Sequence, residues 1–330
     1  MTRFAAIIAL VGVLLVSACG GGEKTPEGVV VPSPTVGSAS PIPTRTVVSA
    51  TPVGALEATV PIGKIGFSSR RDGNGEIYLL TAEGETNITN NPAEDAECDL
   101  SPDGKKLIFA SDREGTYHIY VLNLDGSGLT KLTDAPAGDF SPEWSPDGRR
   151  IAFGRTGAIM VMDSDGSNVQ PVMELRPEAS AEPCGAGAFL GDWSPDGKQL
   201  TFYAADVTTG LGQVCTINVD GSGLRVVASE PPGYHVEPAW SPDGEWIAYR
   251  FIEDQNHEIY LVKPDGSSRI NLTSHPATDI EPAWSPDGMW IAFGSDRTGA
   301  FDLYMMKPDG SGAARLTTSG GKDSEPCWGP

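Results

Sequence analysis

Carboxylate side chains recur at two fixed positions ahead of a repeated tetrapeptide. Ser-Pro-Asp-Gly begins at Ser101, Ser145, Ser194, Ser241 and Ser285, and the chain ends on a degenerate copy in which Gly329 takes the serine position. Aspartate stands six residues before several copies and glutamate four residues before them: Asp95, Asp139, Asp279, Asp323, Glu97, Glu237, Glu281 and Glu325. If these side chains converge, a ring of carboxylates would favour a cation or a basic peptide.

The same carboxylates have other interpretations. Aspartate in a loop often accepts backbone hydrogen bonds, which would brace the segment that leads into the next strand. A divalent cation such as calcium, held by Asp139, Asp279 and Asp323, is a further alternative, and no other cofactor is expected. The sequence leaves these three alternatives open.

The histidines carry no recognisable catalytic or metal-binding pattern. They stand in four different repeat intervals without the short spacing of a zinc site: His118, His235, His257 and His275. No second histidine follows His257-Glu258 four residues later, and Gly-x-Ser-x-Gly does not occur. We therefore predict no catalytic residues and a protein that is not an enzyme.

The spacing of the tetrapeptide predicts the elements that must position the carboxylates. Successive copies begin 44, 49, 47 and 44 residues apart, and tryptophan precedes four of the five. Around the copy at Ser285, four short strands are expected at 281–285, 290–294, 301–306 and 314–317, with Asp-Gly turns after the first and third. Repeats of about 40–45 residues with four strands each are typical of propeller blades.

The order of strands at the two ends of the repeat region predicts how the blades close into a ring. The first strand, at 64–68, matches the second strand of a repeat, and the last, at 325–328, matches a first strand. One blade would combine three N-terminal strands with one C-terminal strand, which removes exposed sheet edges. The prediction for 61–330 is therefore an all-β, six-bladed propeller of four-stranded antiparallel blades.

Strand direction predicts where the acidic positions lie. The connections between blades and the hairpins between second and third strands share one face of such a ring, and the Asp-Gly turns share the other. Both acidic positions stand at the start of the innermost strand, so we expect them around the mouth of the central channel. The longest insertion, at 173–191, should lie on the same face, either as a contact for a partner or as a neutral insertion.

The complete repeat resembles the β-propeller repeat of the TolB family. It reads Trp-Ser-Pro-Asp-Gly, apolar-Ala-Phe, Ser-Asp-Arg-x-Gly, Ile-Tyr, Asp-Gly-Ser and Leu-Thr, and the resemblance covers roughly residues 62–330. It implies the propeller fold and a non-enzymatic role in binding proteins or peptides of the cell envelope. TolB carries an additional N-terminal α/β domain, whereas a different segment stands in that place here.

The N-terminal residues predict export and lipid anchoring. Arg3 precedes an apolar run at 4–16, which is shorter than the roughly 20 residues that cross a bilayer. Val16-Ser17-Ala18-Cys19 resembles the lipobox of bacterial lipoproteins, which implies a signal peptide at 1–18 and lipid on Cys19; an ordinary signal peptide cut nearby is the alternative. The Pro-, Ser- and Thr-rich residues 19–60 predict a disordered tether. We expect the protein on the extracytoplasmic side of a membrane, either the periplasmic face of an outer membrane or the surface of a single-membrane bacterium.

Composition limits the partners of the folded part. The formal net charge of −21 argues against nucleic acid and suits a cationic partner. We expect a monomer that presents an acidic face to an envelope protein or peptide. The alternative is a carbohydrate-binding propeller, or a metal-dependent lyase or hydrolase, that uses the same mouth. Candidate aromatic residues for a sugar platform are Tyr117, Phe140, Phe189, Tyr234 and Phe301.

Four cysteines remain after Cys19, an even number that predicts disulfides in an exported protein. Cys184 and Cys215 both fall near the top of one blade, and a disulfide between them is favoured. Cys98 and Cys327 lie on inner strands of neighbouring blades. A disulfide there depends on how closely those two strands approach.

Overall fold

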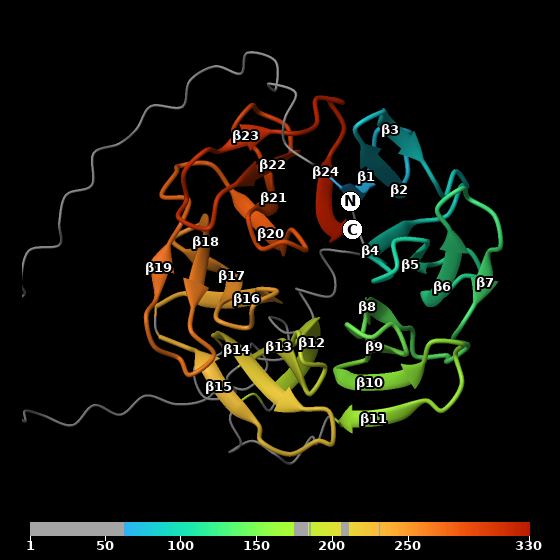
Figure 1. Ribbon diagram of the computed structural model, residues 1–330, viewed down its shortest axis with the longest axis horizontal. Coiled ribbons are helices and arrows are strands. Elements are labelled where there is room, and N and C mark those ends of the chain that lie inside the picture. Colours follow the sequence, from blue (N-terminus) through green and yellow to red (C-terminus); the bar gives the residue numbers. More distant parts are fainter. Residues whose placement is uncertain (1–62, 175–183, 185, 206–210, 231) are drawn as a thin grey trace, which may run out of the picture. The chain divides into compact units, whose positions relative to one another are not determined.

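The structure is a computed structural model that describes residues 63–330 except 175–183, 185, 206–210 and 231. Its described residues form 24 strands in six four-stranded antiparallel sheets, and Figure 1 shows the sheets as blades around a central axis. The predicted six-bladed propeller is thereby confirmed. The predictions for residues 1–60, and most of the insertion at 173–191, lie outside the described residues. None of the described segments is a helix that could cross a membrane.

Each blade runs from an innermost to an outermost strand. Blade 1 consists of β24 (Asp323–Gly329), β1 (Lys64–Ser69), β2 (Glu76–Thr81) and β3 (Gly84–Asn87). Blade 2 consists of β4 (Asp95–Leu100), β5 (Lys106–Ser111), β6 (His118–Asn123) and β7 (Thr130–Lys131). Blade 3 consists of β8 (Phe140–Trp144), β9 (Arg150–Arg155), β10 (Ala158–Asp163) and β11 (Gln170–Met173).

The other three blades follow the same order. Blade 4 consists of β12 (Ala186–Trp193), β13 (Gln199–Ala205), β14 (Gly212–Asn218) and β15 (Arg225–Ala228). Blade 5 consists of β16 (Tyr234–Trp240), β17 (Ile247–Glu253), β18 (Asn256–Val262) and β19 (Ile270–Asn271). Blade 6 consists of β20 (Asp279–Trp284), β21 (Ile291–Ser295), β22 (Asp302–Met306) and β23 (Ala314–Arg315).

Blade 1 closes the ring as predicted, with three early strands and one late strand. β1 pairs antiparallel with β24, from Lys64 opposite Gly329 to Ser69 opposite Asp323. Figure 1 shows the two ends of the colour scale meeting in this blade, β24 in red beside β1 in blue. The innermost strand of blade 1 therefore comes from the far end of the repeat region.

The tryptophan that precedes Ser-Pro-Asp-Gly packs between neighbouring blades. Trp144 of blade 3 lies in a buried cluster with Ile108 and Ile119 of blade 2. Trp284 of blade 6 lies in the equivalent cluster with Ile259 of blade 5. Because burying a large apolar side chain stabilises a fold by roughly 1.5–3 kcal/mol, the tryptophan copies are a main source of blade-to-blade cohesion.

The tetrapeptide itself forms the turn between the first two strands of a blade. Ser285 Oγ donates to Asp287 Oδ1 over 2.6 Å and accepts from the backbone N–H of Trp290 over 2.9 Å. Gly288 takes φ +69°, which only glycine adopts readily. The hydrogen bond from Ser285 lowers the pKa of Asp287, so this aspartate is a brace of the turn.

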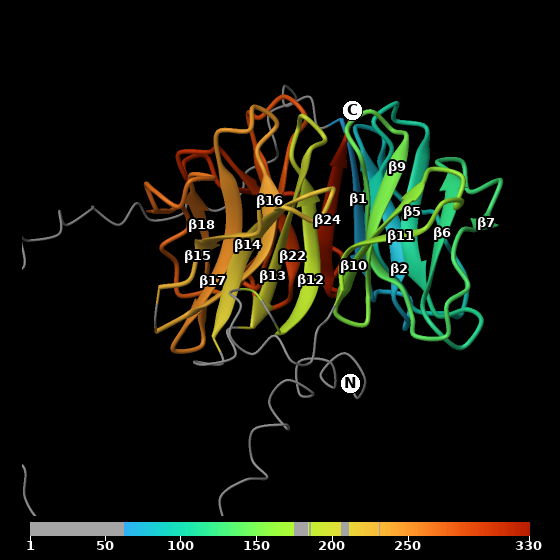
Figure 2. The ribbon, with the colours of Figure 1, turned by 90° about the horizontal axis from the view of Figure 1, so that it is seen from below.

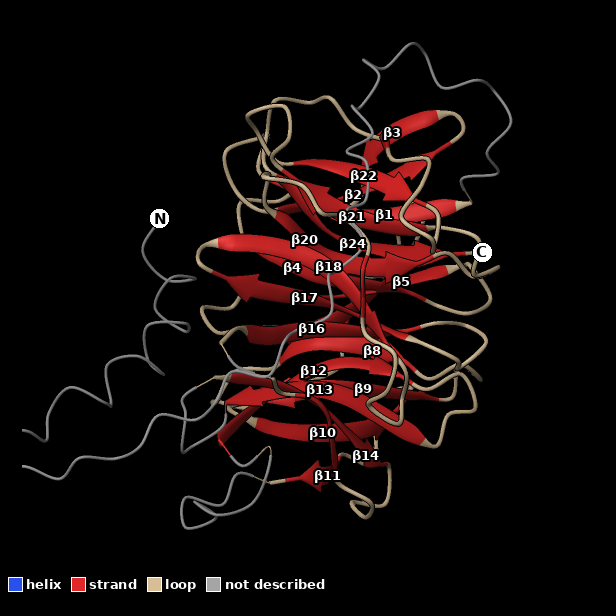
Figure 3. Cartoon of the chain, turned by 90° about the vertical axis from the view of Figure 1, so that its left-hand side faces the viewer, coloured by secondary structure: helices blue, strands red, loops and turns tan. Residues whose placement is uncertain are grey.

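The ring has two different faces, and Figure 2 shows it edge-on. One carries the Ser-Pro-Asp-Gly turns and the end of β24, and we call it the turn face. The opposite one, the loop face, carries the connections between blades and the hairpins between second and third strands. Figure 3 shows that strands run between these two faces in every blade. The start of each innermost strand therefore lies at the loop face.

A carboxylate arc and its binding potential at the channel mouth

Five innermost strands contain a left-handed residue close to the loop face. Positive φ values occur at the same repeat position in each: Glu97 (53°), Ser141 (46°), Glu237 (54°), Glu281 (55°) and Glu325 (54°). The pairing register shifts around this residue in each strand, which marks a β-bulge. Positive φ is uncommon for residues other than glycine, so specific contacts must hold these positions.

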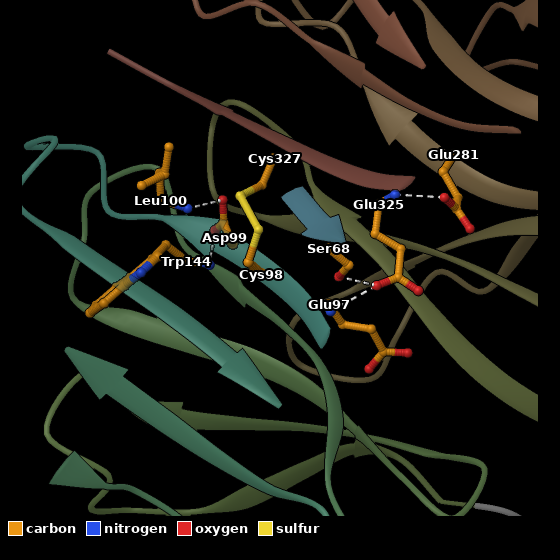
Figure 4. The surroundings of a disulfide bond; sticks show 9 residues. All are labelled: Ser68, Glu97, Cys98, Asp99, Leu100, Trp144, Glu281, Glu325 and Cys327. Atoms are coloured by element: carbon orange, nitrogen blue, oxygen red, sulfur yellow. Dashed lines mark hydrogen bonds between the residues drawn. A yellow bond between two sulfur atoms is a disulfide. The ribbon is translucent and has the colours of Figure 1, made fainter. Parts of the chain in front are cut away.

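Hydrogen bonds between blades provide those contacts. The backbone N–H of Glu325 donates to Glu281 Oε2 over 2.6 Å, and the N–H of Glu97 donates to Glu325 Oε2 over 3.1 Å (Figure 4). At the two ends of the series, Glu237 accepts from the N–H of Glu281 over 3.2 Å, and Glu97 accepts from the N–H of Ser141 over 2.7 Å. We call these four glutamates, which run from blade 5 through blades 6 and 1 to blade 2, the glutamate arc.

The arc leaves carboxylate oxygens available to a ligand. Glu325 Oε2 also accepts from Ser68 Oγ over 2.6 Å, and Glu237 Oε1 lies 2.6 Å from Arg250 Nη2. Within the described part of the chain, no donor hydrogen-bonds to Oε1 of Glu281 or of Glu325. Each of these two carboxylates therefore holds the scaffold with one oxygen, while the other accepts no hydrogen bond from the described residues.

Burial, with repulsion from neighbouring carboxylates, raises the pKa of three glutamates of the arc, Glu97, Glu237 and Glu281. Burial, followed by the charge of Glu325, raises the pKa of Glu97 to about 7. Burial, followed by the charges of Glu237 and Glu325, raises the pKa of Glu281 to about 8. A bound cation would favour the ionised carboxylates, so the arc should release protons when it binds one.

A second set of channel carboxylates was missed at the sequence level. Asp99, Glu143 and Asp192 stand two positions further along the innermost strands of blades 2, 3 and 4. Asp99 Oδ2 accepts from the N–H of Trp144 over 2.7 Å, and Asp192 Oδ2 accepts from the N–H of Trp240 over 3.0 Å. The signal that could have found them is their place directly before the residue that precedes Ser-Pro-Asp-Gly.

These deeper carboxylates share the electrostatic character of the arc. Burial raises the pKa of Asp99 and of Asp192 to about 7. Burial, with the charges of Asp99 and Asp192, raises the pKa of Glu143 well above its ordinary value. The carboxylates of the channel therefore continue past the mouth towards the turn face.

The four aspartates of the predicted ring are not part of the channel surface, which corrects that expectation. Asp279 is completely buried, accepts from Ser295 Oγ over 2.6 Å and pairs with Arg297 Nη2 at 2.8 Å. The other three are equally buried and each pairs with an arginine: Asp95 with Arg113, Asp139 with Arg155, and Asp323 with Arg71. The bracing interpretation therefore accounts for the aspartates.

The arginine of Ser-Asp-Arg-x-Gly links this brace to the blade interior. Arg297 lies 5.2 Å above the ring of Phe293 while its guanidinium neutralises Asp279. Because arginines occupy the oxygens of Asp139, Asp279 and Asp323, these three are poorly suited to hold a metal ion. Across the described residues, no group of three or more His, Cys, Asp or Glu side chains is placed to hold one.

Blade 5 replaces the aspartate with a histidine. His235 is completely buried, its Nε2 lies 3.1 Å from the carbonyl oxygen of Glu230, and its ring stacks on Tyr249 at 5.4 Å. Burial lowers the pKa of His235, so its ring is neutral at neutral pH. In other blades the arginine that pairs with the aspartate also stacks on an aromatic ring. In blade 5 the stacked arginine is Arg269, which lies 4.1 Å above Phe251.

The remaining histidines play no common role. His118 of blade 2 is buried, with Nε2 4.0 Å from Asp134. His257 and His275 stand at separate places on blade 5, and the ring of His275 accepts a backbone hydrogen bond from Ala277. The structure therefore gathers no histidine cluster from the described residues.

Most aromatic residues proposed as a sugar platform are half-buried in pairs. Tyr117 packs on Phe140 at 5.1 Å, and Phe189 stacks on Tyr203 at 4.9 Å. Phe301 lies under Lys322. Tyr234 differs, since 47% of its surface is exposed, and it lines a hollow of about 600 Å³ on blade 5 together with Ile252, Asp254 and His257.

Both cysteine pairs considered from the sequence form disulfides in the structure. Cys184 and Cys215 bond within blade 4, at the base of the long insertion. Cys98 and Cys327 bond between the innermost strands of blades 2 and 1. Figure 4 shows the second disulfide among Glu97, Asp99 and Glu325.

One protein-family model matches nearly the whole described region of the chain. The profile of the TolB beta propeller domain matches residues 58–158 and 154–330. Among curated proteins, the Tol-Pal system protein TolB of Bordetella pertussis (strain Tohama I) is 44% identical over 54 residues. That alignment covers 16% of this chain and 12% of the relative, so the chain matches only a small part of the relative's length.

Solved structures share the fold at low sequence identity. A putative TolB from Agrobacterium tumefaciens has a TM-score of 0.62 and 22% identity, covering 77% of this chain and 88% of its own. TolB from Acinetobacter baumannii has a TM-score of 0.67 and 18% identity, covering 81% and 66%. An oligogalacturonate lyase in complex with manganese has a TM-score of 0.50 and 18% identity, covering 77% and 72%. At such identities these likenesses concern the fold alone.

Proposed function

This chain belongs to the family of TolB β-propeller domains, and we propose that it is a binding module of the cell envelope that takes a cationic segment of a partner protein at its channel mouth. The partner would enter from the loop face as an extended peptide. A lysine or arginine side chain would lie against the glutamate arc. The role is non-enzymatic, and the module acts as a monomer.

The observation that carries this proposal is the pair of uncommitted oxygens on Glu281 and Glu325. Both carboxylates are fixed by hydrogen bonds between blades, so little side-chain freedom is lost when a cation binds them. Their half-buried setting strengthens an interaction with an ammonium or guanidinium group relative to one in open water. The formal net charge of −21 adds a field that attracts such a partner.

Lipid anchoring at Cys19 belongs to the same proposal. The lipobox-like residues 16–19 support it, and the Pro-, Ser- and Thr-rich residues up to 60 would let the propeller reach partners away from the membrane. The predicted location is the extracytoplasmic side of a membrane. Mass spectrometry of membrane-extracted protein should find acyl groups on Cys19, and a Cys19→Ser variant should lose them.

Carbohydrate binding is the second candidate, and one observation favours it. Tyr234 offers an exposed aromatic face beside a hollow with carboxylate, amide and imidazole groups, a combination that suits a sugar ring. Titration with neutral oligosaccharides, comparing the protein with Tyr234→Ala, would test this candidate. A metal-dependent lyase or hydrolase has no comparable support among the described residues.

The main experiment measures binding of a fluorescent octapeptide of glycine and serine with two lysines, against a counterpart with two glutamines. The full chain should bind the lysine peptide more tightly in fluorescence anisotropy, and Glu281→Gln with Glu325→Gln should remove the difference. Glu83→Gln, which neutralises an exposed carboxylate remote from the channel, is the control. Equal affinity for the two peptides would refute the proposal.

Calcium enters as a separate arm of this experiment, since carboxylate oxygens are also the ligands that calcium prefers. Calorimetric titration of the full chain with calcium chloride would measure it directly. Saturable binding that Glu281→Gln with Glu325→Gln abolishes would make the arc an ion site. Calcium that displaces the lysine peptide would show that both ligands use the same carboxylates.

A further inference from the structure

The disulfide between Cys98 and Cys327 gives the ring a second closure. β24 continues from blade 6, whereas β4 follows the three early strands of blade 1 in sequence. The hydrogen bonds between β1 and β24 close the ring non-covalently. The disulfide, whose cysteines stand 229 positions apart in the sequence, joins β24 directly to β4 and closes the same ring covalently.

This closure lies inside the glutamate arc. Cys98 stands between Glu97 and Asp99 on β4, and Cys327 stands two residues after Glu325 on β24 (Figure 4). The arc crosses from β24 to β4 at this point, through the hydrogen bond from the N–H of Glu97 to Glu325 Oε2. The disulfide therefore restrains the two strands that carry half of the arc.

Strand β1 is shaped to accept the disulfide. A Cβ atom at Gly66 would lie 2.5 Å from Cys327 Sγ and 2.9 Å from Cys98 Sγ, so only glycine leaves enough room. The pairing of β1 with β24 shifts between Gly66 and Ser68, and Ser68 then reaches Glu325 Oε2. The disulfide, the bulge and the arc are therefore parts of one local arrangement.

We propose that the Cys98–Cys327 disulfide is a redox clasp that keeps the channel mouth competent to bind. A dithiol reductant would break the sulfur–sulfur bond, supplying two electrons and two protons to give two thiols while it becomes a disulfide itself. Only the hydrogen bonds of β1 with β24 would then hold the closure, and the carboxylates of Glu97 and Glu325 would lose their fixed separation. The binding part of this inference rests on the proposed function.

The buried sulfurs determine how the clasp would open. Cys98 is 6% exposed and Cys327 is 7% exposed, so a reductant reaches them when the inner strands separate locally. The other disulfide is buried completely and joins Cys184 to Cys215 within one blade, away from the closure. It is therefore a matched control for the loss of one disulfide.

The test compares the oxidised full chain with the variants Cys98→Ser/Cys327→Ser and Cys184→Ser/Cys215→Ser. Hydrogen–deuterium exchange at β1 and β24 should accelerate tenfold or more in the first variant alone. Affinity for the lysine octapeptide should fall at least fivefold in the same variant. Unchanged exchange and affinity in Cys98→Ser/Cys327→Ser, or equal changes in both variants, would overturn the clasp.

Two further measurements keep the outcomes separate. If Cys98→Ser/Cys327→Ser fails to fold, the wild-type chain is instead reduced with dithiothreitol and then reoxidised. Hydrogen–deuterium exchange at β1 and β24 that does not respond to reduction of this disulfide overturns the inference. If the oxidised wild-type chain does not prefer the lysine peptide over the glutamine peptide, the proposed function fails. In that case, hydrogen–deuterium exchange at β1 and β24 still tests whether the disulfide holds the ring closed.

Discussion

The backbone N–H of Glu325 lies 2.6 Å from the side-chain Oε2 of Glu281, its counterpart in the preceding blade. Both residues adopt the left-handed conformation, with φ of 54° and 55°. Glu281 and Glu325 therefore act twice: one carboxylate oxygen accepts a hydrogen bond from the neighbouring blade, whereas the other accepts none from the described residues. Substitutions in the arc must separate these two roles.

Neutralising the arc should weaken binding without loosening the ring. In Glu281→Gln the side-chain amide oxygen can still accept from the N–H of Glu325, whereas the charge is lost. We expect the affinity for the lysine octapeptide to fall about tenfold, or ~1.4 kcal/mol, and the melting temperature to hold or rise because repulsion within the arc decreases. Fluorescence anisotropy and thermal melting check this, with Glu83→Gln as the control. An affinity equal to that of Glu83→Gln would contradict the assignment.

Binding of the lysine peptide should strengthen as pH rises. The pKa of Glu97 is raised to about 7 and that of Glu281 to about 8, so both carboxyls are largely protonated at pH 6 and ionised at pH 8.5. We expect affinity to increase across this window, and proton release on binding at pH 7. Calorimetry in buffers of different ionisation enthalpy measures the released protons. A pH-independent affinity would show that the arc does not bind the cation.

In the absence of a ligand, the stability of the folded chain should decline as pH rises from about 4 to about 7. The pKa values of Asp99 and Asp192 are raised to about 7 in the folded chain, so the folded state keeps protons that the unfolded chain releases above pH 4. The stability associated with these carboxyls is fully present below pH 4 and is lost as pH rises to about 7. The melting temperature should therefore fall by several degrees between pH 5 and pH 8.5.

One substitution isolates this effect. Asp192→Asn should flatten the decline, because an amide does not titrate. Asp103→Asn is the control, since Asp103 is exposed and a hydrogen bond from Ser101 lowers its pKa, so it is ionised across the window. Equal slopes in Asp192→Asn and the wild type would exclude the channel carboxyls as the cause.

Removing a buried aspartate should destabilise the blade and leave the affinity of the folded protein unchanged. Asp279→Ala leaves the guanidinium of Arg297 without its buried partner, a change that costs about 3–5 kcal/mol. Arg70→Ala breaks the exposed pair with Glu94, which we expect to cost about 0–1 kcal/mol. Urea unfolding compares the two variants. A loss of peptide affinity in folded Asp279→Ala would contradict this assignment and show that Asp279 takes part in binding.

Gly66→Ala should prevent the Cys98–Cys327 disulfide, because the added methyl group would occupy the space of both sulfurs. Gly154→Ala is the matched control on β9, where the nearest atom to the new Cβ is 3.6 Å away. Mass spectrometry after alkylation should find two additional free thiols in Gly66→Ala only. Intact Cys98–Cys327 in this variant would show that β1 can move aside.

The repeat region shows which structural features a single sequence can reveal. The interval between Ser-Pro-Asp-Gly copies depends on local turn chemistry, so it predicted the six blades. The three-plus-one closure followed from the order of strands alone. Asp279 and Glu281 look equivalent in sequence, but the bulge where β20 pairs with β21 breaks the alternation of sides along β20. The aspartate therefore pairs with Arg297 inside the blade, and the glutamate accepts from its counterpart in the next blade.

Other features depend on contacts between distant segments. Arg250 pairs with Glu237 because β16 and β17 adopt a particular register, which no spacing in the sequence discloses. Asp99, Glu143 and Asp192 lie beside residues that dominate the repeat pattern, and only three of the six blades have an acid there. His235 replaces an aspartate although the residues that follow it, Val236 to Trp240, keep the pattern of the repeat.

The shared blade also determines when the fold can be completed. Ser69 on β1 hydrogen-bonds to Asp323 on β24, 254 positions further along the chain, so β1–β3 gain their inner neighbour only when β24 reaches them. Contacts of such large sequence separation slow folding and leave a strand edge exposed meanwhile. Folding of this propeller is therefore expected to end at blade 1.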